Sequence, residues 1–195
     1  MKKGFLHVLG LIGFIFVSNA QELIIGEERI EPGIIFIFEG AIKDNVSPNS
    51  FHLDEKQTNV HIEARVNWDT QNVPTGTPLG GFIPYLHITA QIINEKTSLS
   101  TFIDLTAHIN LIDNFHYARN ISLPGKIDDL YTVKFSILPP THIELAFHKD
   151  WKEKYGKTLF EHSSFSYSNV DFEEIAKATR NWFYFLLDKS LRLNL

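Results

Sequence analysis

The sequence lacks cysteine and has a single methionine, Met1, among its 195 residues. Without cysteine the chain has no disulfide bonds, no cysteine nucleophile and no acceptor for a lipoprotein anchor. Basic residues are also in the minority, because 18 Lys and Arg face 23 Asp and Glu and leave a net charge of −5. A mildly acidic chain without a basic run is a poor candidate for binding nucleic acid or an anionic membrane.

Motifs of common enzymes are missing as well. The sequence has no glycine-rich phosphate loop, no Gly-x-Ser-x-Gly and no His-Glu-x-x-His. A serine triad leaves no local signature, but nothing in the sequence points to one. These absences favour a binding protein over an enzyme.

The first 20 residues have the layout of a secretory signal peptide. Lys2 and Lys3 precede an apolar run over 5–17, and Ser18 and Ala20 place small residues before the expected cleavage point. The apolar run is short for a membrane span. We therefore expect an exported, periplasmic protein that begins at Gln21, has no membrane span and carries a charge of −5 − 2 = −7 after loss of the two lysines.

Residues 21–170 have the pattern of short β-strands. In the segment 59–66, Val60, Ile62, Ala64 and Val66 alternate with polar residues, which is typical of a half-buried strand. Turn residues such as Pro139 and Pro140 separate several of the segments. The other expected strands are 33–38, 82–93, 100–106, 131–138 and 163–170. Short strands with few helical stretches between them predict one all-β domain, an antiparallel β-sandwich.

The pattern becomes helical over 171–195. Asp171 is a candidate N-cap, and apolar residues then recur every three to four positions, which predicts an amphipathic helix from about Asp171 to Leu191. We expect this helix to pack on the sandwich. A contact in a dimer and a contact with a membrane surface are the alternatives.

Side chains that can bind a metal occur in three segments. His61 and Glu63 lie two apart on an expected strand, so both project from one face and can converge on an ion. Asp113 and His116 lie three apart in a segment that reads as a loop, and His148 follows the prolines. Each also has an ordinary interpretation, either a solvated strand face or a turn residue.

Several segments resemble the periplasmic iron-transport protein family, whose members partner an inner-membrane iron permease. The resemblance covers roughly residues 22–170 and rests on the order and spacing of short motifs. These motifs are Ile25-Gly26-Glu27, Asn59-Val60-His61-Ile62-Glu63-Ala64, Phe82-Ile83-Pro84-Tyr85-Leu86, Asp113 with His116-Tyr117, and His148-Lys149-Asp150 after Pro139-Pro140.

The resemblance implies an immunoglobulin-like β-sandwich, often a homodimer, with a metal site near the surface. Members of the family bind copper and are implicated in iron uptake. Carried over by position, the metal ligands would be His61, Glu63, Asp113, His116 and His148. The bound ion would be a divalent transition metal, copper or iron, with zinc as a further possibility.

One departure concerns the sulfur ligand. The family site contains a methionine shortly before its Asp, where this sequence has Ile109, or Leu105 if a gap is placed differently. Neither side chain binds metal, although the adjacent His108 could substitute. A site with only nitrogen and oxygen ligands is harder and should prefer Cu(II), Zn or Fe over Cu(I).

Three functions therefore compete. The first is an exported protein that binds a divalent cation and delivers it in iron uptake. The second is an exported interaction module that kept the sandwich and lost the metal site. The third is a redox enzyme that uses copper or iron, which would need an exchangeable coordination position.

Overall fold

The structure is a computed structural model that describes residues 22–179. Their strands are β1 (Leu23–Ile30), β2 (Ile34–Ala41), β3 (Val60–Trp68), β4 (His87–Asn94), β5 (Ser100–Ile109), β6 (Phe115–Ile121), β7 (Leu130–Leu138) and β8 (Ser163–Asp171). The helices are the 3-10 turn η1 (Glu55–Gln57), α1 (Lys149–Tyr155) and α2 (Glu173–Lys177). The expected all-β antiparallel class is confirmed, and the immunoglobulin-like topology stays a prediction.

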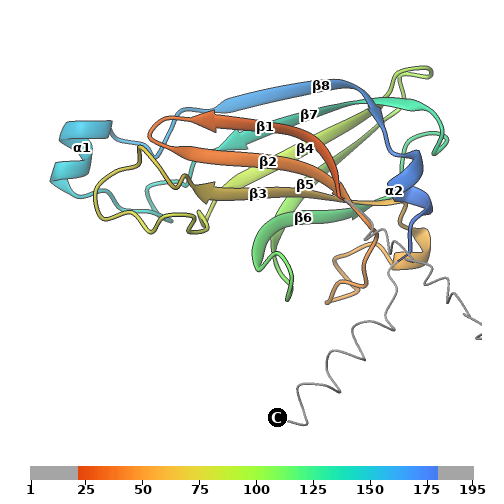
Figure 1. The fold of residues 1–195 in the computed structure, drawn as a ribbon, viewed down its shortest axis with the longest axis horizontal. Coiled ribbons are helices and arrows are strands. Elements are labelled where there is room, and N and C mark those ends of the chain that lie inside the picture. Colours follow the sequence, from red (N-terminus) through yellow and green to blue (C-terminus); the bar gives the residue numbers. More distant parts are fainter. Residues whose placement is uncertain (1–21, 180–195) are drawn as a thin grey trace, which may run out of the picture.

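The strands form one sheet that folds over on itself into two packed layers (Figure 1). Their order is β1-β2-β3-β6-β5-β4-β7-β8. The change of layer happens within β5, which pairs with β4 through Ser100–Leu105 and with β6 through Thr106–Ile109. The two edge strands lie side by side, where the Tyr167 hydroxyl donates to Glu28 at 3.0 Å. Gly26 permits this approach, because a Cβ there would lie 2.2 Å from the Tyr167 ring.

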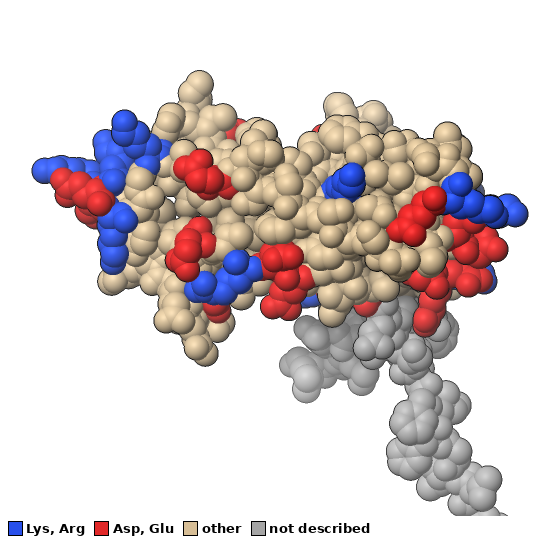
Figure 2. Space-filling model, turned by 90° about the horizontal axis from the view of Figure 1, so that it is seen from above, with Lys and Arg blue, Asp and Glu red and all other residues tan. Residues whose placement is uncertain are grey.

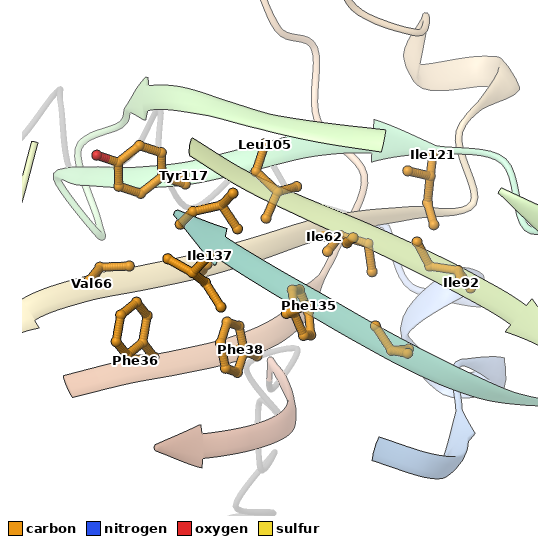
Figure 3. Close-up of a cluster of buried hydrophobic side chains, with 14 of the residues drawn as sticks. Phe36, Phe38, Ile62, Val66, Ile92, Leu105, Tyr117, Ile121, Phe135 and Ile137 are labelled. Carbon is orange, nitrogen blue, oxygen red and sulfur yellow. The ribbon is translucent and has the colours of Figure 1, made fainter. Parts of the chain in front are cut away.

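The core fills the space between the layers with aliphatic and aromatic side chains (Figure 3). The alternation predicted for β3 is confirmed, because Val60, Ile62, Ala64 and Val66 are all fully buried. Phe38 of β2 stacks on Phe135 of β7 with ring centroids 4.0 Å apart, which joins the two layers. Large apolar side chains thus hold the inner face of β3 in place, and its polar side chains must project from the outer face.

The expected strand over 82–93 begins later than predicted, at His87. Tyr85 has a φ of 65°, which an extended strand does not allow, and Pro84 precedes it. The backbone of this segment bonds to a side chain instead. The Tyr117 hydroxyl donates to the Ile83 carbonyl at 2.8 Å and accepts from the Leu86 N–H at 3.1 Å. Burial raises the pKa of Tyr117 to about 12, so the hydroxyl keeps its proton for this contact.

Three other expectations about local structure need correction. The segment around His116, predicted to be a loop, belongs to strand β6. Strand β1 and helix α1 were not predicted. Of the expected C-terminal helix the structure describes only α2, whose C-cap Ala178 is extended; Asp171 ends β8 and accepts the Glu173 N–H at 2.8 Å. The predicted signal peptide and residues 180–195 lie outside the described residues.

The charge on the surface is mixed in sign. On the face shown in Figure 2, Lys and Arg form small groups next to acidic residues, with the largest group at the end that carries α1. Within residues 22–179, no helix has the length and apolar character needed to cross a membrane.

The stacked pair of phenylalanines leads to a prediction about stability. Phe135→Ala should lower the free energy of unfolding by about 3–5 kcal/mol, because it leaves a cavity between the layers. Phe102→Ala is the matched control, since Phe102 is 70% exposed on β5, and it should cost less than about 0.5 kcal/mol. Urea unfolding of both variants measures the difference. Similar losses in the two variants would contradict a core between the layers.

Candidate metal centre

The candidate site lies on the outer face of β3, β6 and β5, which are neighbours in the sheet. The register pairs His61 with Asn120 and Glu63 with Ala118 across β3 and β6, and it pairs His108 with His116 across β5 and β6. These side chains therefore project from the same face. His61, Glu63 and His116 are no more than 3% exposed, so β3 is buried on its outer face as well as on its core face.

Three imidazole rings converge on this face. His61, His108 and His116 each offer one nitrogen, and these nitrogens all lie within 4.8 Å of one another. Metal–nitrogen bonds of about 2.0–2.1 Å allow at most about 4.2 Å between two nitrogens on one ion. The rings must therefore close only slightly to share an ion, and the three residues fit a transition-metal cation.

Hydrogen bonds set which nitrogen each ring offers. Asn120 donates its amide hydrogens to the carbonyls of Asp44 at 2.7 Å and Leu53 at 2.9 Å, so its oxygen must face His61. That oxygen lies 2.6 Å from His61 Nδ1, which must carry the proton. His116 Nδ1 likewise donates to the Asn114 carbonyl at 3.1 Å. In both rings Nε2 keeps its lone pair, as a metal ligand must.

A group of carboxylates adjoins the rings. Glu22, Glu63 and Asp113 each place an oxygen within 4.8 Å of the others, and Glu63 Oε1 lies 3.7 Å from His61 Nε2. The Asn110 amide holds Asp113 at 2.7 Å in the turn that joins β5 to β6. Imidazoles and carboxylates together make a donor set for Cu(II), Zn or Fe.

Fixed positive charge offsets only part of this negative charge. Glu39 pairs with Arg65 at 2.5 Å, and Glu22 lies 3.8 Å from the same guanidinium. Burial raises the pKa of Glu39, although Arg65 opposes this effect. Glu63 and Asp113 add two further carboxylates beside this pair, so a bound cation would offset negative charge that Arg65 leaves in place.

The rings open into a cleft of about 720 Å³. One wall belongs to the segment 42–59 between β2 and β3, hereafter the β2–β3 loop. Asn120 ties this loop to the sheet through its two amide bonds, and Arg119 donates to the Phe51 carbonyl at 2.7 Å. The loop also carries His52, whose ring lies 5.0 Å from that of His108.

Four of the five residues predicted from the sequence come together in the structure. His61 and His116 are in the imidazole group, and Glu63 and Asp113 are in the carboxylate group. His148 belongs to neither group, because it is the exposed N-cap of α1, at the end of the molecule away from the β2–β3 loop (Figure 1). Its role as a ligand stays a prediction from the resemblance alone.

The alternatives considered for the missing methionine have different outcomes. Leu105 is buried in the core and Ile109 is 65% exposed. His108, the adjacent residue, supplies the third imidazole. The sequence signal that could have found it is a pair of histidines on either side of a segment with turn-forming Asn and Asp residues. In the structure this segment is the turn of a hairpin, and His108 pairs with His116 across it. Glu39 was missed because the pairing of β2 with β3 leaves no local motif, and Glu22 because it lies just before β1, which reaches β3 only through β2.

The crowded rings lead to a prediction about pH. Burial, followed by the neighbouring His61 and His52, lowers the pKa of His108 to about 3, and burial also lowers the pKa of His116. The unfolded chain binds protons at these rings from about pH 6.5 downward, whereas the folded chain does so only at lower pH. Protonation of these rings in the unfolded chain should therefore lower the free energy of unfolding of the metal-free protein as the pH falls from about 6.5 toward 3.

A His108→Asn variant tests this prediction. Its free energy of unfolding, measured by urea between pH 7 and pH 4 with a chelator present, should fall less steeply than that of the parent chain. Comparing the two slopes removes the contribution of the carboxylates, which both proteins share. Equal slopes would mean that His108 titrates normally in the folded protein.

Comparison with solved structures shows the same fold in two proteins. A copper-bound variant of FetP from uropathogenic Escherichia coli strain F11 superposes with a TM-score of 0.63 at 20% identity, covering 77% of this chain and 99% of that one. Copper-reconstituted P19 from Campylobacter jejuni gives a TM-score of 0.63 at 22% identity, covering 76% and 94%. No curated relative matches the chain.

The sequence itself matches a family model. The model is described as Fe2+ transport protein and matches residues 19–174, which include every strand and all the converging side chains. This match agrees with the resemblance recognised from short motifs. The chain therefore belongs to the Fe2+ transport protein family.

Proposed function

We propose that the protein binds a divalent transition-metal cation, copper or iron, and takes part in iron uptake as an exported, periplasmic carrier. The observation that carries the proposal is the convergence of three imidazoles from three strands, with a carboxylate 3.7 Å from one of them. Membership of an Fe2+ transport family supports the role. The copper-bound states of FetP and P19 support the kind of ion.

The direct role is binding and transfer, not catalysis. The donor set consists of nitrogen and oxygen atoms only, so it should favour Cu(II), Fe or Zn over Cu(I). Delivery to an inner-membrane iron permease and assembly as a homodimer are parts of the proposal that come from the family resemblance. The periplasmic location has the predicted signal peptide as its support, together with the periplasmic expression of FetP.

Removal of ligands tests the site. The protein from Gln21 onward, purified without chelators, should bind Cu(II), Zn or Fe(II) in a calorimetric titration. A double variant, His61→Ala with His116→Ala, should lose affinity by more than the roughly 10–100-fold that changes outside the ligand set cause. His142→Ala is the matched control, because His142 is an exposed loop residue outside both groups of converging side chains.

The outcomes separate the competing functions. Equal binding by the double variant and the control would contradict the assignment of the site. No uptake of any metal by the parent chain would favour the interaction module that has lost its site. Turnover of copper or iron by the loaded protein would favour the redox enzyme.

Asn120 provides a second test, because it positions His61 without touching the ion. Asn120→Ala should weaken metal binding by about 10–100-fold, since the His61 ring loses the acceptor that fixes its proton on Nδ1. Asn120→Asp keeps an acceptor at that position and should retain more of the affinity. Urea unfolding of the metal-free variants controls for a general loss of stability. Equal affinity in all three proteins would contradict a role of Asn120 in positioning His61.

A further inference from the structure

His52 is an imidazole of the cleft that belongs to neither group of converging side chains. Its ring lies edge-on to His108 with centroids 5.0 Å apart, and it lines the same cleft as the three converging rings. Its Nδ1 is buried and has no hydrogen-bond partner among residues 22–179. A buried imidazole nitrogen without a partner is costly, unless a ligand arrives to use it.

The backbone holds His52 in place from both sides. Arg119 donates to the carbonyl of Phe51, the residue before it, at 2.7 Å. Asn120 donates to the carbonyl of Leu53, the residue after it, at 2.9 Å. The Arg119 guanidinium is itself held by an ion pair with Asp104 at 2.8 Å. The ring is thus presented to the cleft by an anchored segment of the β2–β3 loop, as preorganised ligands are.

We propose that His52 and His108 form an outer binding position for a divalent cation at the mouth of the cleft. This inference rests on the proposed function and adds a second position to it. His52 is not within reach of all three converging nitrogens, so it cannot complete the inner group without moving. His108 is in contact with both sets of rings, at 5.0 Å from His52 and 5.4 Å from His61 between centroids, so it is shared by the two positions. When both positions are filled, His108 binds one ion through each ring nitrogen, as an imidazolate that has released its N–H proton to water.

The two positions differ in the number of protein ligands. The outer one offers two imidazoles and leaves the remaining coordination to water, so an ion held there is bound weakly and exchanges readily. The inner one adds His61, His116 and Glu63, which bind more tightly. His52 belongs to the β2–β3 loop, which forms one wall of the cleft, and its ring adjoins that of His108, which the inner position also uses. The outer position therefore serves capture and release.

Asn120 connects the two positions. Its oxygen fixes the proton of the inner ligand His61, and its amide hydrogens hold the loop on both flanks of the segment that carries His52. A displacement of the loop that breaks these bonds also frees the His61 ring. The outer and inner ligands are therefore mechanically coupled through one side chain.

Calorimetric titration with Cu(II) of the metal-free protein from Gln21 onward tests the inference. The parent chain should bind a first equivalent tightly and a second one more weakly. His52→Ala and His52→Gln should keep the first equivalent and lose the second. His108→Ala should lose the second and weaken the first, because it removes the shared ring. His142→Ala, the exposed control, should keep both.

Each outcome decides the inference. Loss of the second equivalent in both His52 variants, with the first intact, supports the outer position and also shows that the variants are folded. A second equivalent that survives in the His52 variants, or a parent chain that takes up only one, overturns the outer position and leaves the proposed function standing. A parent chain that takes up none overturns both.

Discussion

The burial of β3 on both of its faces is the constraint on which the rest of the molecule depends. One face carries Val60, Ile62, Ala64 and Val66 into the core, and the other carries His61 and Glu63 into the site. A strand in an antiparallel sandwich usually has one face in water. Here the β2–β3 loop is tied to the outer face through Asn120, whose hydrogen bonds satisfy His61 and two loop carbonyls at once. Removal of this one amide would disturb the wall of the cleft and the inner ligand together.

The same arrangement makes the site costly without a cation. Carboxylates and imidazoles withdrawn from water lose hydration, and among residues 22–179 Arg65 is the basic residue that pairs with Glu22 and Glu39. The opposite pKa shifts show this cost. Burial disfavours the charged form, so it raises the pKa of Glu39 and lowers the pKa of His108 and His116. A divalent cation requires neutral rings and anionic carboxylates, so the lowered pKa of the two rings favours its binding, whereas the raised pKa of Glu39 opposes the anionic form of that carboxylate.

Alternation along one strand was enough to predict from the sequence which face of β3 would carry His61 and Glu63, because a period of two is a local property. The side chains that join them depend on pairing between strands, which is not local. His108 enters the site because the β5–β6 hairpin turns at Asn110 and Asp113, and a turn one residue longer would send it to the opposite face. Glu39 is placed opposite Glu63 by the pairing of β2 with β3, and the position of His52 depends on bonds between the β2–β3 loop and β6.

The helical pattern after Asp171 shows that periodicity can also predict more helix at a boundary than the structure forms there. Glu173–Lys177 does form a helix, but β8 takes Asp171 into the ladder with Leu130, and Ala178 is extended. Pairing between strands therefore overrides local helix signals at that boundary. His148 is a comparable case, since its segment forms the start of α1 and presents it to solvent instead of to the other four predicted residues.

The position of His108 changes what the missing sulfur ligand implies for the site. A sandwich that served only as an interaction module would have no physical reason to keep three imidazoles and several carboxylates on one half-buried face. Apolar side chains of similar volume at those places would give a more stable protein, since buried charge without its partner is destabilising. The face instead carries an imidazole beside the place where the resemblance puts a thioether. In the proposed site, that exchange would replace a soft sulfur donor with a harder nitrogen donor, which favours a harder, oxidised ion over a soft, reduced one.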